Sequence, residues 1–83
     1  MAYTYILKLA NGTYYVGSTF SLRNRLTEHN AGLDFYTKQH LPVELVYYEE
    51  HPSQDEAVKR EMQIKGWSRT KKEKLIYGEW KKQ

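Results

Sequence analysis

The chain has no cysteine among its 83 residues, so neither a disulfide nor a thiolate zinc site can form. It also has no apolar run long enough to span a membrane or to form the core of a signal peptide. These absences favour an unprocessed, soluble protein of the cytoplasm and give no indication of a membrane partner. A single domain covering residues 1–83 is expected, because so short a chain leaves no room for a second core.

The charge balance is mildly basic, and tyrosine is frequent. The formal net charge is +3 and the sequence pI is about 9.1, which permits a nucleic-acid partner but does not establish one. The chain holds eight tyrosines, and this side chain suits half-buried sheets and wet sites because it joins an apolar ring to a polar tip.

The spacing of apolar residues predicts an α+β domain, in which helices pack on a small sheet. The expected order is strand, strand, helix, strand, helix, helix, and Asn11-Gly12 marks a hairpin turn between the first two strands. The expected strands cover residues 3–9, 13–16 and 43–50. The expected helices cover 21–30, 54–66 and a basic segment, 68–80, whose Leu75, Ile76 and Trp80 could dock on the sheet.

Two polar side chains fall on or beside the apolar stripe of the first expected helix. Leu22, Leu26 and Leu33 recur at helical spacing, and at about 100° per residue His29 falls inside this stripe and Arg25 on its edge. His29 is either a satisfied structural group or a site residue. Arg25 either extends past the core to solvent or joins His29, since residues four apart are neighbours on a helix.

Glu61 falls on the inner face of the second expected helix, between Ala57 and Ile64 and flanked by Val58 and Met62. A carboxylate in that position is costly unless a cation or a hydrogen-bond donor meets it. Two interpretations stay open, namely a buried pair with a lysine or arginine, and a metal ligand. The same rotation places three charged residues nearer to solvent: Glu56, Lys59 and Arg60.

The residues that do not fit their positions come from four different elements: Tyr5, Tyr15, Arg25, His29 and Glu61. A hydrolytic phosphodiesterase needs groups of these kinds. One group must deprotonate a water molecule, a cation must stabilise charge on the phosphate, and a carboxylate must hold a divalent metal.

Three segments of the sequence resemble the GIY-YIG nuclease superfamily in its small, stand-alone, single-domain branch. They are "YTYIL", "YYVGSTFSLRNRLTEH" and "DEAVKREMQIKGWSRTKKEKLI", and the resemblance runs from residue 3 to residue 77. It implies a three-stranded antiparallel sheet flanked by helices, which agrees with the fold expected from the residues.

The resemblance also implies roles for individual residues. Tyr5 and Tyr15 match the two motif tyrosines, either of which would activate water, Arg25 would contact the scissile phosphate, and His29 matches a polar catalytic position. Glu61 would hold one Mg²⁺ or Mn²⁺ ion. A tyrosine base needs a cationic neighbour to lower its pKa, and Arg25, His29 or the metal could serve. Substrate-binding positions fall on Gly17, Ser18 and Lys65.

The implied activity is metal-dependent hydrolysis of phosphodiester bonds in nucleic acid, most plausibly DNA, with selection by structure rather than by sequence. The alternative is a nucleic-acid-binding module that kept the fold but is non-catalytic, or that depends on a protein partner. Basic residues of the last two expected helices could contact a phosphate backbone, or could form an ordinary solvated face: Lys59, Arg60, Lys65, Arg69, Lys71, Lys72 and Lys74.

The sequence departs from the family pattern in three places. In the first motif only the final tyrosine, Tyr5, survives. Ser18 stands where some members carry a lysine, and no asparagine follows Lys65. The incomplete first motif costs little, whereas the missing lysine and asparagine leave the rate and the protonation scheme open.

The length of the hairpin loop decides whether the two motif tyrosines can share a site. With a two-residue loop, Tyr5 and Tyr15 point to opposite faces of the sheet. With a three-residue loop, 10–12, Leu7 opposes Tyr15 and Tyr5 opposes Gly17 on one face. We predict the three-residue loop, and we expect Gly17 to leave space above Tyr5 for a phosphate.

Overall fold

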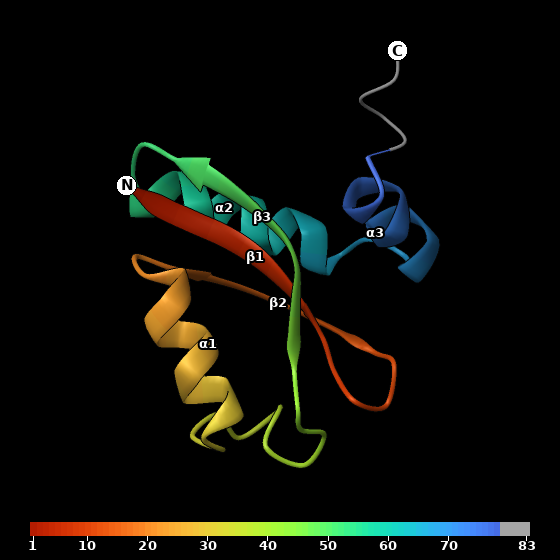
Figure 1. Cartoon of the computed structure of the whole chain (residues 1–83). Helices are drawn as coiled ribbons and strands as arrows, with labels where there is room; N and C mark the ends of the chain where they lie inside the picture. The colour runs from red at the N-terminus through yellow and green to blue at the C-terminus, as the bar shows by residue number, and fades with distance from the viewer. Residues whose placement is uncertain (79–83) are drawn as a thin grey trace.

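The computed structural model describes residues 1–78 as one sheet with three helices. The order of elements is the predicted one, and the fold class is α+β (Figure 1). The elements are β1 (Ala2–Lys8), β2 (Tyr14–Thr19), α1 (Leu22–Asn30), β3 (Glu44–His51), α2 (Gln54–Lys65) and α3 (Arg69–Ile76). No helix in this part of the chain is long and apolar enough to cross a membrane.

Two of the element boundaries differ from those expected by more than one residue. The second strand continues to Thr19 instead of ending at Val16, because Ser18 and Thr19 still pair with β1. The last helix ends at Ile76 and is capped by Tyr77, whereas the expected segment ran to residue 80. Of the three residues expected to dock from this segment, Leu75 is buried, Ile76 is partly buried, and Trp80 lies outside the described residues.

Serine caps begin all three helices. The side-chain oxygens of Ser21, Ser53 and Ser68 each accept a hydrogen bond from the backbone N–H three residues later. At the end of α1 the chain turns through Gly32, whose φ is +80°. Two bonds close this end, from Gly32 N–H to the His29 carbonyl and from Leu33 N–H to the Glu28 carbonyl.

The sheet is antiparallel throughout, with strand order β2-β1-β3. Leu7 opposes Tyr15 and Tyr5 opposes Gly17, which confirms the predicted register. The loop is the three-residue one, because Leu9 N–H donates to the Thr13 carbonyl at 2.9 Å and Gly12 adopts a φ of +87°.

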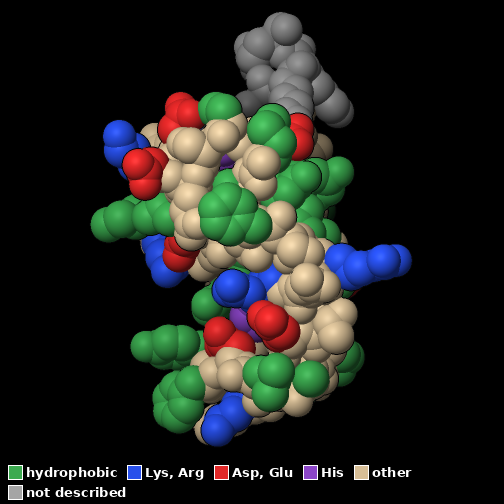
Figure 2. All heavy atoms as spheres, turned by 90° about the vertical axis from the view of Figure 1, so that its left-hand side faces the viewer, with side chains coloured by type: hydrophobic (Ala, Val, Ile, Leu, Met, Phe, Trp, Pro, Cys, Tyr) green, Lys and Arg blue, Asp and Glu red, His purple; other side chains and the backbone are tan. Residues whose placement is uncertain are grey.

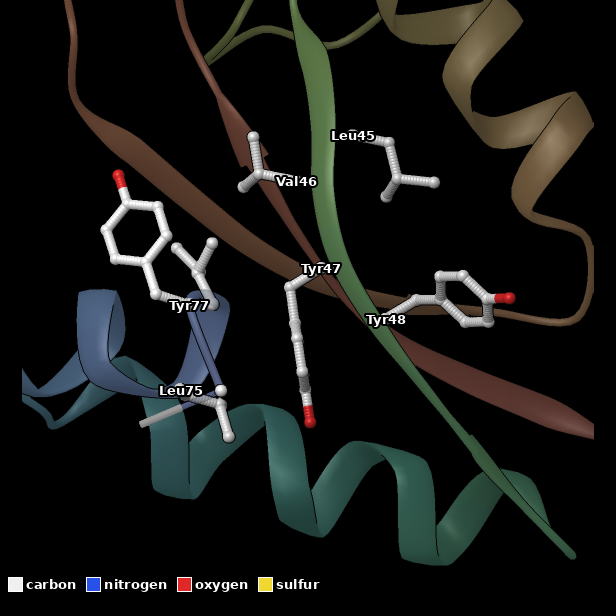
Figure 3. A pocket seen from close by; sticks show the side chains of 8 residues that line it. Leu45, Val46, Tyr47, Tyr48, Leu75 and Tyr77 are labelled. Atoms are coloured by element: carbon white, nitrogen blue, oxygen red, sulfur yellow. The ribbon is translucent and has the colours of Figure 1, made fainter. Parts of the chain in front are cut away.

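Separate hydrophobic clusters cover the two faces of the sheet. The cluster on the α1 face is built from Tyr5, Leu7, Leu9 and Val43, with Leu22 and Leu26 of α1 packed on it. The cluster on the other face, under α2 and α3, is built from Ile6, Val16, Ile64 and Leu75. A bulge in β3 places two consecutive side chains on the same face of the sheet. Figure 3 shows Val46 and Tyr47 on one side of the strand and Leu45 and Tyr48 on the other.

Two residues expected on inner helix faces are exposed. Leu33 is 74% exposed because it lies beyond the turn that ends α1. Met62 is 68% exposed because it lies on the outer side of α2, while Ala57 and Ile64 are fully buried.

Several basic side chains of the last two helices make contacts within the fold. Arg60 donates from Nε to the Glu49 carboxylate at 2.8 Å and lies over the Trp67 ring. Arg69 donates to the Gly12 carbonyl at 2.7 Å, pairs with Glu73 and lies over the ring of Tyr14. Lys71 lies over the ring of Trp67.

Candidate functional site

Tyr5 lies across β2, where Gly17 makes room for it. A β-carbon at position 17 would lie 2.5 Å from the Tyr5 hydroxyl oxygen and 2.6 Å from its Cζ. Gly17 has no side chain, and the ring and hydroxyl of Tyr5 fill the space that a side chain would need. The expectation that Gly17 leaves space for a phosphate was wrong, because Tyr5 already occupies that space.

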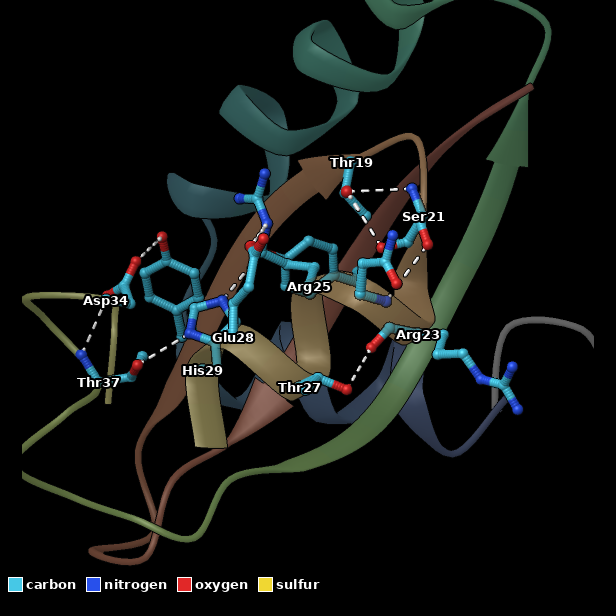
Figure 4. A network of polar contacts seen from close by, with 12 residues as sticks. Thr19, Ser21, Arg23, Arg25, Thr27, Glu28, His29, Asp34 and Thr37 are labelled. Carbon is cyan, nitrogen blue, oxygen red and sulfur yellow. Dashed lines mark hydrogen bonds and ion pairs between the residues drawn. The ribbon is translucent and has the colours of Figure 1, made fainter. Parts of the chain in front are cut away.

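His29 connects Tyr5 to the segment that follows α1. Its Nε2 lies 3.2 Å from the Tyr5 hydroxyl, and its Nδ1 lies 2.8 Å from Oγ1 of Thr37. His29 and Thr37 are both completely buried, and Figure 4 shows them bridged between α1 and the following segment. Burial lowers the pKa of His29, so the imidazole is neutral at pH 7 and supplies no positive charge to either tyrosine.

Tyr15 lies beside this pair and binds Asp34. Its ring centroid is 5.2 Å from that of His29 and 6.5 Å from that of Tyr5, and its hydroxyl donates to the Asp34 carboxylate at 3.5 Å. The other oxygen of Asp34 accepts hydrogen bonds from two backbone N–H groups, at residues 36 and 37. Asp34 therefore fixes the backbone of its own segment and also holds the Tyr15 hydroxyl in place.

The sequence analysis missed Asp34 and Thr37, because it assigned no helix or strand to the segment between residues 30 and 43. The available signal was an aspartate three residues before a threonine, a spacing at which an Asp side chain accepts from the following backbone N–H groups and fixes a turn.

Arg25 lies at the open side of this group. Its Nε is 3.2 Å from a Glu28 carboxylate oxygen, and its side chain is 41% exposed. A hollow of about 200 Å³ is lined by Arg25, Glu28, His29, Leu33 and Asp34. Figure 2 shows a histidine side chain set between acidic and basic side chains on this face of the molecule.

Glu61 reaches the same region from α2. Its side chain is only 16% exposed, and its two oxygens meet the Ser18 hydroxyl at 2.8 Å and the Lys65 ammonium at 2.7 Å. This contact matches the first of the two interpretations, a carboxylate paired with a lysine. Hydrogen bonding to Glu61 raises the pKa of Lys65, so the lysine stays charged at pH 7.

The residues around Glu61 fit a Mg²⁺ site in which the protein supplies few of the ligands. Within residues 1–78 no group of three or more His, Cys, Asp or Glu side chains could enclose a metal ion. Magnesium is commonly held by one or two carboxylates, with water and substrate phosphate supplying the other ligands. Glu61 meets this requirement once Lys65 releases one of its oxygens.

The two halves of the site approach each other past the edge of β2. Tyr5, Tyr15 and His29 lie on the α1 face of the sheet, whereas Ser18 and Glu61 lie on the α2 face. No other strand pairs with the outer side of β2 in the described sheet. Charges from the α2 side act on both phenols, since Lys65 and Glu61 each influence the pKa of Tyr15 and Glu61 that of Tyr5.

Both tyrosines are held in the protonated form. Burial raises the pKa of Tyr5, with the Tyr15 hydroxyl adding to the effect and Arg25 opposing it. Burial and the Asp34 carboxylate raise the pKa of Tyr15, and Lys65 and Arg25 offset this only in part. The expectation that nearby cations lower a phenol pKa is therefore met in direction but outweighed by burial.

All eight residues singled out in the sequence lie in this region. Those on the α1 face are Tyr5, Tyr15, Arg25 and His29, and those on β2 and α2 are Gly17, Ser18, Glu61 and Lys65.

This fold and this set of residues define a class of protein. The chain belongs to the GIY-YIG family, because the GIY-YIG catalytic domain matches residues 1–74. It is 44% identical over 78 residues to a UPF0213 protein of Natronomonas pharaonis, covering 93% of this chain and 92% of the relative. It is 45% identical over 75 residues to a UPF0213 protein of Staphylococcus saprophyticus, covering 89% and 92%.

A solved structure resembles the chain as well. The solution NMR structure of a UPF0213 protein from Bacillus halodurans gives a TM-score of 0.60 at 37% identity. The match covers 93% of this chain and 84% of that one.

Proposed function

We propose that this protein is a metal-dependent endonuclease that hydrolyses DNA phosphodiester bonds and selects its substrate by structure rather than by sequence. One observation carries the proposal. Two phenols and an arginine lie on the α1 side of β2, and the Glu61 carboxylate reaches Ser18 of the same strand from the other side, at an edge with no partner strand among the described residues. A purely binding surface has no use for a carboxylate directed at a phosphate.

Arg25 is the group that would bind the scissile phosphate. Its guanidinium is partly exposed at the mouth of the hollow, while its partner Glu28 is exposed and can be displaced at low cost. A phosphate bound there lies near both phenols, since Arg25 acts electrostatically on Tyr5 and on Tyr15.

Tyr5 is the better supported general base. Its hydroxyl contacts the neutral imidazole of His29, which can accept the phenolic proton at Nε2 while Nδ1–H donates to Thr37. Tyr5 can then take a proton from water as it passes its own to His29. This relay avoids forming a free phenolate whose pKa burial has raised.

Glu61 is the residue that would hold one Mg²⁺ or Mn²⁺ ion, and such an ion supplies charge stabilisation to the phosphate and the leaving oxygen. Lys65, displaced from Glu61, is then available to bind a substrate phosphate, and Ser18 keeps the carboxylate oriented. Specificity supplied by a protein partner is compatible with this arrangement.

Cleavage of labelled single-stranded, duplex and branched DNA with Mg²⁺ or Mn²⁺ tests the proposal. We expect metal-dependent cutting that Glu61→Gln, Tyr5→Phe and Arg25→Ala each reduce by a hundredfold or more, about 2.7 kcal/mol of transition-state stabilisation. Glu56→Gln, at an exposed carboxylate on the same helix, is the matched control for Glu61→Gln and should cut normally. Cutting that survives all three substitutions, or salt-sensitive binding without cutting, would instead indicate a contaminant or a binding module.

A further inference from the structure

Two aromatic side chains project from the segment after α1, and we call them the aromatic ledge: Phe35 and Tyr36. They are 71% and 75% exposed, and their rings meet edge to face at a centroid distance of 5.8 Å. The Lys38 ammonium lies 5.1 Å from the centre of the Phe35 ring. Neighbouring aromatic side chains that are both exposed to solvent often mark an interaction surface.

The backbone beneath the ledge is fixed by its own hydrogen bonds. Asp34 accepts from the N–H groups of Tyr36 and Thr37 at 2.9 and 3.1 Å, and its carbonyl accepts from Lys38 N–H at 3.0 Å. The buried Thr37 anchors the segment on His29. The rings are therefore presented on an ordered turn, which lowers the entropy lost when a ligand binds to them.

The ledge adjoins the candidate active site on two sides. Leu33 and Asp34, the residues just before it, line the hollow that contains Arg25. On the other side Lys65 lies near the Tyr36 hydroxyl, which adds to the effect of Glu61 and Tyr15 on the pKa of that lysine. Figure 2 shows hydrophobic side chains projecting beside the charged hollow on this face.

We propose that the aromatic ledge stacks an unpaired base of the substrate strand, next to the phosphate that Arg25 binds. The inference rests on the proposed function and gives it a substrate class, namely a strand with an unstacked nucleotide beside the bond to be cut. Base stacking on aromatic rings needs a flat π-face with cations close by to meet the backbone. Phe35 and Tyr36 supply the faces, Lys38 lies over the Phe35 ring, and Arg25 lines the hollow next to them.

The experiment measures binding rather than cutting, so that it stands apart from the test of nuclease activity. Glu61→Gln protein without metal is titrated with a DNA duplex that carries one extrahelical base. A second duplex has an abasic residue at the same position. We expect the extrahelical base to improve affinity by about tenfold, as one stacked base should. Replacing that base with 2-aminopurine should give quenched fluorescence on binding.

Two ledge variants and one control make the result specific. Phe35→Ala/Tyr36→Ala should remove the preference for the extrahelical base, and so should Phe35→Leu/Tyr36→Leu, which keeps apolar surface but has no ring. Tyr48→Ala, at a tyrosine of β3 that is 56% exposed, should keep it. The ledge side chains are exposed, so thermal unfolding of the two ledge variants should be unchanged, whereas Tyr48→Ala loses an edge contact with Tyr3 and is assayed well below its own unfolding temperature.

Three outcomes overturn the inference. Equal affinity of the parent protein for the two duplexes means that no base is stacked. A preference that survives the leucine variant means that the base binds elsewhere. A change in oligomeric state on ledge substitution, seen by sedimentation, assigns the ledge to a second copy of the chain. If the protein prefers the extrahelical base but cuts no DNA, the stacking proposal stands and the proposed nuclease activity fails.

Discussion

Thr37 shows how much a single buried hydroxyl can control. Its Oγ1 lies 2.8 Å from Nδ1 of His29, and both residues are fully buried, so it orients the ring and decides which nitrogen faces Tyr5. We predict that Thr37→Val lowers cleavage about tenfold or more, whereas Thr37→Ser, which keeps the hydroxyl, restores most of it.

The ¹⁵N chemical shifts of His29 check this role without reference to activity. They should show a single tautomer in the wild type and in Thr37→Ser, and a mixture in Thr37→Val. An unchanged tautomer in the valine variant would show that Thr37 only fills space.

Gly17 should tolerate no side chain while Tyr5 is present. An alanine β-carbon would lie 2.5 Å from the Tyr5 hydroxyl, and a tyrosine that is 1% exposed has nowhere to move. We predict that Gly17→Ala costs about 1–3 kcal/mol of unfolding free energy, a typical penalty for overpacking. In a Tyr5→Leu background the cost should be smaller, and a double-mutant cycle in urea measures the difference. Additive effects would show that the glycine is needed for another reason.

His29 gives both stability and activity a pH dependence of known sign. Its pKa is lowered in the folded protein, by burial first and by Arg25, while Asp34 and Glu28 oppose the shift. The unfolded chain therefore binds more protons, and stability falls as the pH drops below about 6.5. His29→Gln should flatten that decline in chemical denaturation.

The same residue separates two mechanisms. If Tyr5 relays its proton to neutral His29, the cleavage rate should level off once His29 is neutral, at a pH below the ordinary histidine pKa of about 6.5, because burial lowers the pKa of His29. A rate that climbs tenfold per pH unit through pH 9 would instead indicate a free phenolate as the base.

At the scale of elements, the sequence predicted what depends on local pattern. The hairpin register followed from Asn11-Gly12 and the period of two in strands, and the helices followed from serine caps and helical spacing. The positions of His29 and Glu61 followed from helix rotation. Local pattern does not predict tertiary contacts. Asp34 and Thr37 were missed because they contact Tyr15 and His29 only when their segment packs against α1.

Arg69 illustrates the same limit on α3. From sequence it resembled any basic residue of a solvated face, yet it fastens α3 to the hairpin through the Gly12 carbonyl and the Tyr14 ring. We predict that Arg69→Ala destabilises the protein by about 1 kcal/mol, a modest value because the side chain is 55% exposed. Arg69→Lys should lose most of the same amount, since an ammonium lacks the planar face, and thermal unfolding compares the two variants.

At the scale of the whole molecule, the formal net charge is +3, and the proposed function makes the contribution of basic side chains to DNA binding measurable. The logarithm of the affinity for duplex DNA should fall linearly with the logarithm of salt concentration, with a slope of about −0.9 per phosphate contacted. Lys59→Gln/Lys74→Gln removes two exposed charges and should make that slope shallower without altering thermal unfolding. A slope that does not change would exclude these lysines from the contact surface.

The open edge of β2 has a consequence for association. Protein sheets avoid runaway strand addition by covering or charging their outer strands. Here the two halves of the candidate site lie on either side of the outer strand, so under the proposed function a covering element there would block substrate. Under that function, catalysis and protection from aggregation compete for the same few residues of β2. A short peptide that pairs with this strand should act as an inhibitor without entering the hollow at all.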